Sequence, residues 1–183
     1  MKSPPALDDL AETIREILVR IVKPGVDLEL DRALMKEHGL DSLDMIETSF
    51  ALEEFFGFDF SGRNAIQELE SRLGGGRVLA DGVLTPLGRE ALYERMPELR
   101  TVDLPPTLHA AELPQYFTIR TYARLIKDFY DHAPEVCPDS GEQVVLDGWS
   151  LVSERSRRPV DAPKGDQLLD SWLDAKAREL GSA

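Results

Sequence analysis

The sequence predicts a mainly α-helical fold that is interrupted by a helix–hairpin–helix segment and followed by an extension of mixed character. Apolar residues recur at intervals of three and four positions over residues 7–22, 42–56 and 118–129, which is the pattern of amphipathic helices. Glycine-rich and proline-rich turns separate the remaining stretches. A length of 183 residues has room for one small domain with large appendages.

Composition limits the function classes. The hydrophobic fraction of 42% supports a packed core, while the net charge of −13 makes nucleic acid an unfavourable partner and favours docking onto basic patches of other proteins. The single cysteine, Cys137, excludes an intrachain disulfide and a cysteine-based metal site. The chain has no signal-like segment and no apolar run long enough to insert into a membrane, so we expect a soluble cytoplasmic protein.

The first helix is expected from Leu7 to Val22. Acidic residues fill its first turns, where they complement the positive end of the helix dipole, and Lys23-Pro24-Gly25 should end it. A loop over residues 26–39 follows. Three spaced leucines should anchor this loop to the core: Leu28, Leu30 and Leu34.

The second helix is expected from Ser42 to Phe56, with Gly57 ending it. Gly39 allows the backbone to turn and Asp41 can cap the first free amides, so Ser42 should be exposed at the start of the helix. One stripe of the helix comprises Leu43, Ile46 and Phe50, and another comprises Met45, Ser49, Leu52 and Phe56. The residues expected to face outward are Asp44, Glu47, Ala51 and Glu54.

The segment 39–56 resembles the acyl carrier proteins. The resemblance rests on Gly39-Leu40-Asp41-Ser42-Leu43 and on the helix ending Ala51-Leu52-Glu53-Glu54-Phe55. It implies that Ser42 carries a covalent 4′-phosphopantetheine arm, taken from coenzyme A, whose thiol holds cargo as a thioester. It also implies that Asp41 and Leu43 are flanking recognition residues.

The same resemblance implies partners rather than catalysis. A phosphopantetheinyl transferase with magnesium would attach the arm, and the amides at the helix start could help to position its phosphodiester. An acyl-loading ligase or acyltransferase, a synthase and other pathway enzymes would dock through basic patches onto Asp44, Glu47 and Glu54. The protein itself is expected to be a monomeric carrier for fatty-acid, polyketide or specialised lipid synthesis, with no catalytic residues and no metal site.

The helix that closes the carrier bundle is expected far downstream. Thr118 can cap it, and one face carries Ile119, Tyr122, Ala123, Ile126 and Phe129. The resulting division is an acyl-carrier-like four-helix bundle over residues 5–133, in which an insert at 61–114 replaces the short third helix, followed by a C-terminal extension over 134–183.

The insert has its own start and stop signals. A helix over Ala65–Leu73 should end at three glycines, and a hairpin over Arg77–Thr85 should turn at Asp81-Gly82. Thr85-Pro86 should then begin a helix that reaches Met96. This order resembles winged-helix modules, but the acidic surroundings oppose DNA binding.

The extension should contain a hairpin over residues 144–151, a polar stretch over 154–163 and a terminal helix over 167–180. The polar stretch carries Arg155, Arg157 and Arg158. Because Trp172 offers a large apolar area, the terminal helix should pack back onto the domain rather than bind a partner.

Functions other than an acyl carrier are also compatible with parts of the sequence. A stand-alone aminoacyl or peptidyl carrier can share the Asp-Ser-Leu motif, and a noncatalytic interaction protein would leave Ser42 unmodified. A serine hydrolase could pair Ser42 with His38, His109 or His132, but the Gly-x-Ser-x-Gly elbow is absent. Metal binding by Cys137 and His132 lacks enough ligands.

Overall fold

The structure is a computed structural model that describes residues 4–21 and 25–181. Its α-helices are α1 (Leu7–Ile21), α2 (Ser42–Phe56), α3 (Ala65–Leu73), α4 (Pro86–Arg95), α5 (Ile119–Asp131) and α6 (Gly165–Gly181), and its 3₁₀ helices are η1 (Pro97–Thr101) and η2 (Ala110–Tyr116). Two antiparallel hairpins complete it, β1 (Leu79–Ala80) with β2 (Val83–Leu84) and β3 (Val144–Asp147) with β4 (Ser150–Ser153). The mainly helical fold class is confirmed. The predicted end of the first helix, at Val22 and Lys23-Pro24, lies outside the described residues.

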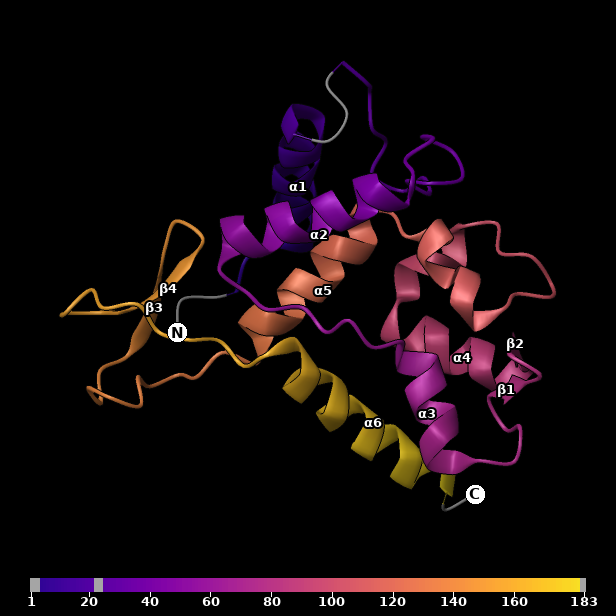
Figure 1. The fold of residues 1–183 in the computed structure, drawn as a ribbon. Helices are drawn as coiled ribbons and strands as arrows, with labels where there is room; N and C mark the ends of the chain where they lie inside the picture. The colour runs from indigo at the N-terminus through magenta and orange to yellow at the C-terminus, as the bar shows by residue number, and fades with distance from the viewer. Residues whose placement is uncertain (1–3, 22–24, 182–183) are drawn as a thin grey trace.

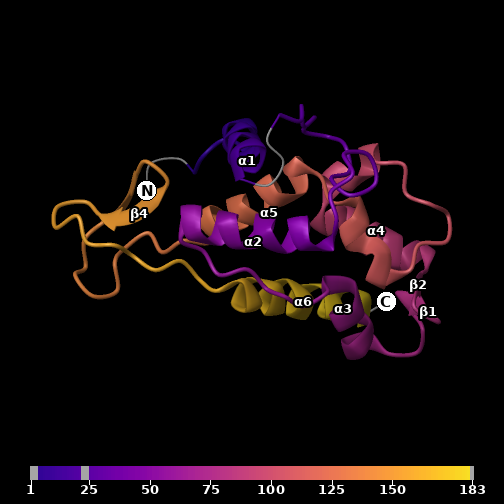
Figure 2. The ribbon, with the colours of Figure 1, turned by 45° about the horizontal axis from the view of Figure 1, so that its top comes forward.

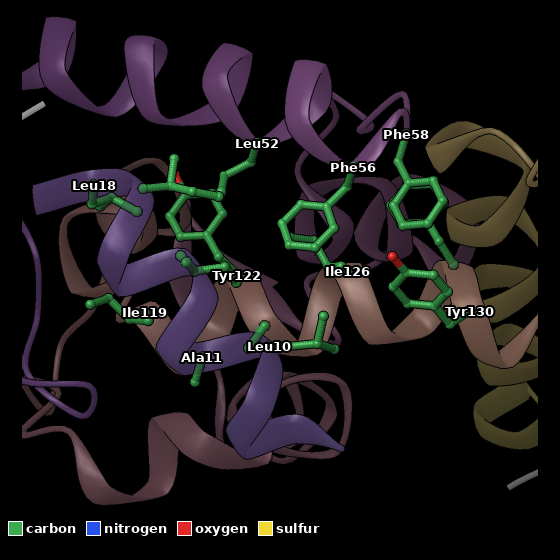
Figure 3. Packing of buried hydrophobic residues seen from close by; sticks show 14 of the residues in the cluster. Leu10, Ala11, Leu18, Leu52, Phe56, Phe58, Ile119, Tyr122, Ile126 and Tyr130 are labelled. Atoms are coloured by element: carbon green, nitrogen blue, oxygen red, sulfur yellow. The ribbon is translucent and has the colours of Figure 1, made fainter. Parts of the chain in front are cut away.

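Helices α1, α2 and α5 enclose the first core (Figures 1 and 3). The α5 stripe predicted from its spacing lies wholly within this core: Ile119, Tyr122, Ala123, Ile126 and Phe129. Thr118 caps α5 as predicted, through a reciprocal capping box with Thr121. A helix that is separated from α2 by 62 residues thus packs beside α1 and α2.

Aromatic rings fill the end of this core where α2 finishes. Phe58 stacks on Phe129 with ring centroids 4.7 Å apart, and Phe56 meets Trp149 edge-on at 5.7 Å. The Tyr130 hydroxyl donates a hydrogen bond of 2.6 Å to the Trp149 carbonyl, and burial raises the pKa of Tyr130. These contacts join the β3–β4 hairpin, which projects at the left of Figure 1, to the C-terminal end of α2.

A second core lies between the insert and the terminal helix. Leu169 and Leu173 of α6 are buried together with Ile66 and Leu69 of α3 and Leu92 of α4. Figure 2 shows α6 beside α3, below the layer that contains α2 and α5. The prediction that the terminal helix packs onto the domain is confirmed.

Two glycines permit close backbone contacts in this half of the molecule. A Cβ on Gly88 would lie 2.0 Å from the Val78 carbonyl oxygen, and a Cβ on Gly165 would lie 2.3 Å from the Ser61 amide nitrogen. Only glycine therefore lets α4 approach the β1 side of the hairpin and lets α6 begin beside the chain that leads into α3.

Opposite charges line the contact between α3 and α6. The Arg72 guanidinium pairs with Asp170 at 2.6 Å and with Asp174, and the Arg63 guanidinium pairs with Asp170 at 3.1 Å. The two aspartates are four residues apart, so one face of α6 meets both arginines. Among the described residues, no helix is both long and apolar enough to cross a bilayer.

Several boundaries differ from the sequence predictions. The hairpin expected over residues 77–85 has strands of two residues each. Thr85 lies beyond the strands, where its amide donates to the Val78 carbonyl and its hydroxyl caps α4 by accepting from the Gly88 amide. The second hairpin extends to Ser153, two residues beyond the predicted end. The last helix begins at Gly165 rather than Gln167.

Candidate functional site

Ser42 is exposed at the first position of α2, as predicted. Gly39 adopts the left-handed backbone conformation, with φ of 70°, and reverses the chain just before the helix. Leu40 then enters the core, and its amide donates a 3.0 Å hydrogen bond to the Leu34 carbonyl. This buried residue, two positions before Ser42, fixes the backbone that presents the hydroxyl.

Asp41 caps α2 in the predicted way. Its Oδ1 accepts hydrogen bonds from the amides of Leu43 at 2.8 Å and Asp44 at 2.9 Å. Asp44 completes a capping box, because its Oδ2 accepts from the Asp41 amide at 2.9 Å. The sequence-based expectation that helix-start amides would help to position a phosphodiester therefore fails for Leu43 and Asp44, whose amides are bound to Asp41.

The loop before Ser42 is anchored to the start of α5. The Leu34 amide donates a 2.9 Å hydrogen bond to the Phe117 carbonyl, and the Arg120 amide donates one of 3.2 Å to the Leu30 carbonyl. The Arg120 guanidinium also pairs with Asp8 of α1 at 2.6 Å and with Asp31 of the loop at 2.7 Å. The hydrogen bond to Asp8 and the charge of Asp31 raise the pKa of Arg120.

Sequence reasoning did not identify Phe117 and Arg120 as supports for the site. They lie about 75 residues beyond Ser42 in the printed sequence, and only tertiary packing places them beneath its loop. Leu28 and Leu34 are buried and Leu30 is half-buried, so the predicted anchoring of the loop by its leucines is confirmed.

The outer face of α2 is more apolar than predicted. Leu43, Ile46 and Phe50, one of the two predicted stripes, are 61%, 53% and 66% exposed. Their spacing of three and four residues places them on one face, which also carries the exposed Glu47 and Glu54. We call these five residues the outer face of α2.

Two residues expected to face outward on α2, Ala51 and Asp44, are half-buried instead. Ala51 is half-buried and packs against the first core, while Thr48, which belonged to neither predicted stripe, is fully buried. Asp44 is half-buried because its carboxylate turns back to the cap. The helix therefore buries the residues Met45, Thr48, Leu52 and Phe56.

The predicted alternatives that use histidine find no supporting geometry in the described part of the chain. The His38 Nε2 accepts a 3.1 Å hydrogen bond from the Glu29 amide, and the His132 ring lies against Asp128. Cys137 is buried, and hydrogen bonds involving Ser140 and Ser153 lower the pKa of its thiol to about 7. The described residues contain no group of three or more histidine, cysteine, aspartate or glutamate side chains that could hold a metal ion.

Comparison with known proteins finds a family match in the N-terminal part of the chain. Residues 12–71 match the family model described as a phosphopantetheine attachment site. No curated protein and no solved structure matches the chain significantly. The matched range contains all of α2 together with the loop that supports its start. Residues 12–71 thus form a phosphopantetheine-binding domain, an attachment site for covalent 4′-phosphopantetheine, consistent with the acyl carrier protein family.

Proposed function

We propose that the protein is an acyl carrier protein in which Ser42 carries the 4′-phosphopantetheine arm. The observation that carries this proposal is the position of Ser42, an exposed hydroxyl at the start of α2 within the matched domain. The capping residue before it and the buried Leu40 fix the backbone on the N-terminal side. A modifying enzyme therefore meets a hydroxyl in a defined place, with little local ordering required on binding.

The attachment reaction is a phosphoryl transfer. The Ser42 Oγ forms a bond to phosphorus while the phosphoanhydride of coenzyme A breaks, and the nucleotide part leaves. The hydroxyl proton passes to a base of the transferase, which also supplies magnesium. Because Asp41 occupies the amides of Leu43 and Asp44, the arm is held by its covalent bond and stays free to move between partner enzymes.

The outer face of α2 is the proposed docking surface. Leu43, Ile46 and Phe50 offer exposed apolar area beside Ser42, while Glu47 and Glu54 offer negative charge to basic patches. The transferase, a loading ligase or acyltransferase, and a synthase would use this surface in turn. Asp41 and Leu43 flank the modified hydroxyl and would be read by the transferase.

The proposed cargo is an acyl group rather than an aminoacyl or peptidyl group. The Gly-x-Asp-Ser-Leu form and the acidic second helix support this choice, because both resemble stand-alone fatty-acid and polyketide carriers. The protein would act as a noncatalytic monomer, with pathway enzymes supplying the chemistry. A buried, unpaired thiol at Cys137 supports a reducing, cytoplasmic environment.

Intact-protein mass spectrometry tests the proposal. The full chain is incubated with coenzyme A, magnesium and a broad-specificity phosphopantetheinyl transferase, alongside Ser42→Ala and Ser171→Ala. Ser171 is a matched control because it is an exposed serine on another helix, α6. We expect one phosphopantetheine increment on the wild type and on Ser171→Ala and none on Ser42→Ala. An unmodified wild type with several transferases would refute the carrier function.

A further inference from the structure

A cavity of about 230 Å³ lies where the two cores meet. The chain entering α3, the last turn of α4, the second half of α5 and the first turns of α6 all contribute to its wall. Figure 1 shows α6 extending from near the end of α5 toward α3, with α4 beside α3. We call it the seam cavity. It is distinct from the first core, which α1, α2 and α5 enclose, because most of its wall belongs to the insert and to the terminal helix.

Most of the wall of the seam cavity is apolar. Its apolar side chains come from both sides of the seam and include Ile66, Leu92, Met96, Leu125, Phe129 and Leu168. Phe129 and Leu168 belong to the first core, whereas Ile66, Leu92 and Met96 belong to the second. A cavity lined in this way favours an apolar occupant, because water finds few hydrogen-bond partners there.

The charged side chains in the wall are neutralised by one another or by neighbours. Arg95 pairs with Asp128 at 2.7 Å, and its guanidinium lies 5.7 Å from the centre of the Trp172 ring. Arg63 pairs with Glu68 at 2.6 Å and with Asp170 at 3.1 Å. A free carboxylate or phosphate entering the cavity would have to compete with these pairs, so the wall suits an uncharged group.

The volume limits the size of the occupant. A dry apolar cavity of roughly 150 Å³ can take benzene, and pockets for drug-sized ligands begin at roughly 300 Å³. At about 230 Å³ the seam cavity lies between these limits. The size therefore fits a short aliphatic or aromatic acyl group.

Phe117 connects the seam cavity to the candidate attachment site. Phe117 lines the cavity, and its backbone carbonyl accepts the hydrogen bond from the Leu34 amide that anchors the loop before Ser42. The Leu34 carbonyl in turn accepts from Leu40, two residues from the serine. A single residue thus borders both the cavity and the platform that presents the Ser42 hydroxyl.

From this arrangement we infer that the seam cavity binds a short, uncharged acyl group. The inference rests on the proposed carrier function for the source of that group, which is the thioester at the end of the arm on Ser42. A free short-chain acid offers the same apolar chain with a charged end. The insert and the terminal helix then have a purpose in the carrier, because together they build most of the wall.

In the experiment, a broad-specificity phosphopantetheinyl transferase with magnesium loads the full chain from octanoyl coenzyme A that carries a ¹³C-labelled terminal methyl group. In parallel, Ser42→Ala is titrated with free octanoic acid labelled in the same way. Nuclear Overhauser contacts from the labelled methyl to the Phe117 and Phe129 rings are measured in each case. Two variants fill the cavity, Leu125→Trp and the smaller change Ala65→Leu, both at half-buried wall positions.

Leu73→Trp is the matched control, because Leu73 is half-buried beside the second core but lies outside the cavity wall. We expect contacts from the arm-borne methyl in the wild type and in Leu73→Trp, and a loss of at least tenfold in their intensity in both filling variants. Contacts from the free acid alone would support the cavity as a site for an apolar chain but would overturn its assignment to the uncharged, arm-borne acyl group. If loading fails, the carrier function fails, while the free-acid titration still decides for or against the cavity. Absence of contacts from both sources would overturn the inference.

Discussion

At the start of α2, the side chains of Asp41 and Asp44 each accept a hydrogen bond from the other residue's backbone amide. The Asp41 Oδ1 accepts from the Asp44 amide at 2.9 Å, and the Asp44 Oδ2 accepts from the Asp41 amide at the same distance. Asp44 was predicted only as a docking residue, yet its carboxylate completes the cap of the helix. Substituting Asp44 would therefore alter stability as well as surface charge, and its proposed docking role needs variants that leave the cap intact.

Removing the cap should destabilise the protein. Asp41→Ala leaves the amides of Leu43 and Asp44 without their acceptor, and we expect the free energy of unfolding to fall by about 1 kcal/mol. Asp41→Asn keeps an oxygen acceptor and should lose less. Urea unfolding followed by circular dichroism measures both. Equal stability of Asp41→Ala and the wild type would show that the cap contributes nothing to the fold.

Charge reversal on the outer face of α2 should weaken docking without unfolding the helix. Glu47 and Glu54 are exposed, so we expect the double variant Glu47→Lys/Glu54→Lys to keep its circular dichroism spectrum and melting midpoint. The KM of the transferase for this variant should rise about tenfold, and the rise should diminish in high salt. Glu112→Lys, an exposed change on η2, is the control. An unchanged KM would remove these two glutamates from the docking surface.

The junction between α6 and the chain leading into α3 should be intolerant of a side chain. Gly165→Ala places a Cβ 2.3 Å from the Ser61 amide nitrogen and 2.7 Å from the Asp59 carbonyl oxygen. Because both obstacles are backbone atoms, we expect a loss of about 1–3 kcal/mol in the free energy of unfolding. Gly62→Ala is the matched control, since its Cβ would meet nothing within 4 Å.

The same pair of glycine variants tests the division of the chain. A single unfolding transition that shifts in Gly165→Ala would mean that residues 134–183 unfold together with the bundle. An early separate transition would mean that the terminal helix detaches first. A Gly165→Ala protein as stable as Gly62→Ala would contradict the close approach itself.

Glu70 should make stability depend on pH in the acid range. Its carboxylate accepts from the amides of Leu79, Val78 and Gly76, and these bonds lower its pKa from the ordinary value of 4.5. A lowered folded-state pKa contributes stability above pH 4.5, and this contribution is lost as the pH falls through the folded-state pKa. Glu70→Gln should therefore be less stable than the wild type at neutral pH.

The difference between Glu70→Gln and the wild type should shrink as the solution is acidified below pH 4.5. Urea midpoints of both proteins across a pH series measure it. The exposed Glu112→Gln, elsewhere on the surface, corrects for general effects of acid. A gap between Glu70→Gln and the wild type that stays constant with pH would contradict the assigned role.

Local signals predicted most of the helices and the immediate surroundings of Ser42. Asp41 and Gly57 delimit α2 at the predicted residues, and Thr85-Pro86 begins α4, because caps and turns depend on neighbours in sequence. The stripe on α5 was predicted from its helical spacing. These are features that a few adjacent residues determine.

Tertiary contacts between elements that are distant in the sequence were harder to predict. Periodicity identified two stripes on α2 but could not tell that Leu43, Ile46 and Phe50 stay exposed while Thr48 is buried. Nothing near Ser42 in sequence points to Phe117 as the support for its loop. The seam cavity likewise requires α3 and α6 to meet, and they are separated by more than 90 residues.

Because α3 and α6 are far apart in the sequence, the two cores can form at different times during synthesis. Helices α1, α2 and α5 are complete once residue 131 has emerged, so these three can assemble before Leu168 of α6 joins the first core. The apolar faces of α3 and α4 must wait for α6, which follows them by more than 60 residues in the sequence. Until then, Arg63 and Arg72 lack their aspartate partners on α6. A ribosome stalled before residue 165 would therefore carry a nascent chain with an exposed, aggregation-prone surface beside an already folded bundle.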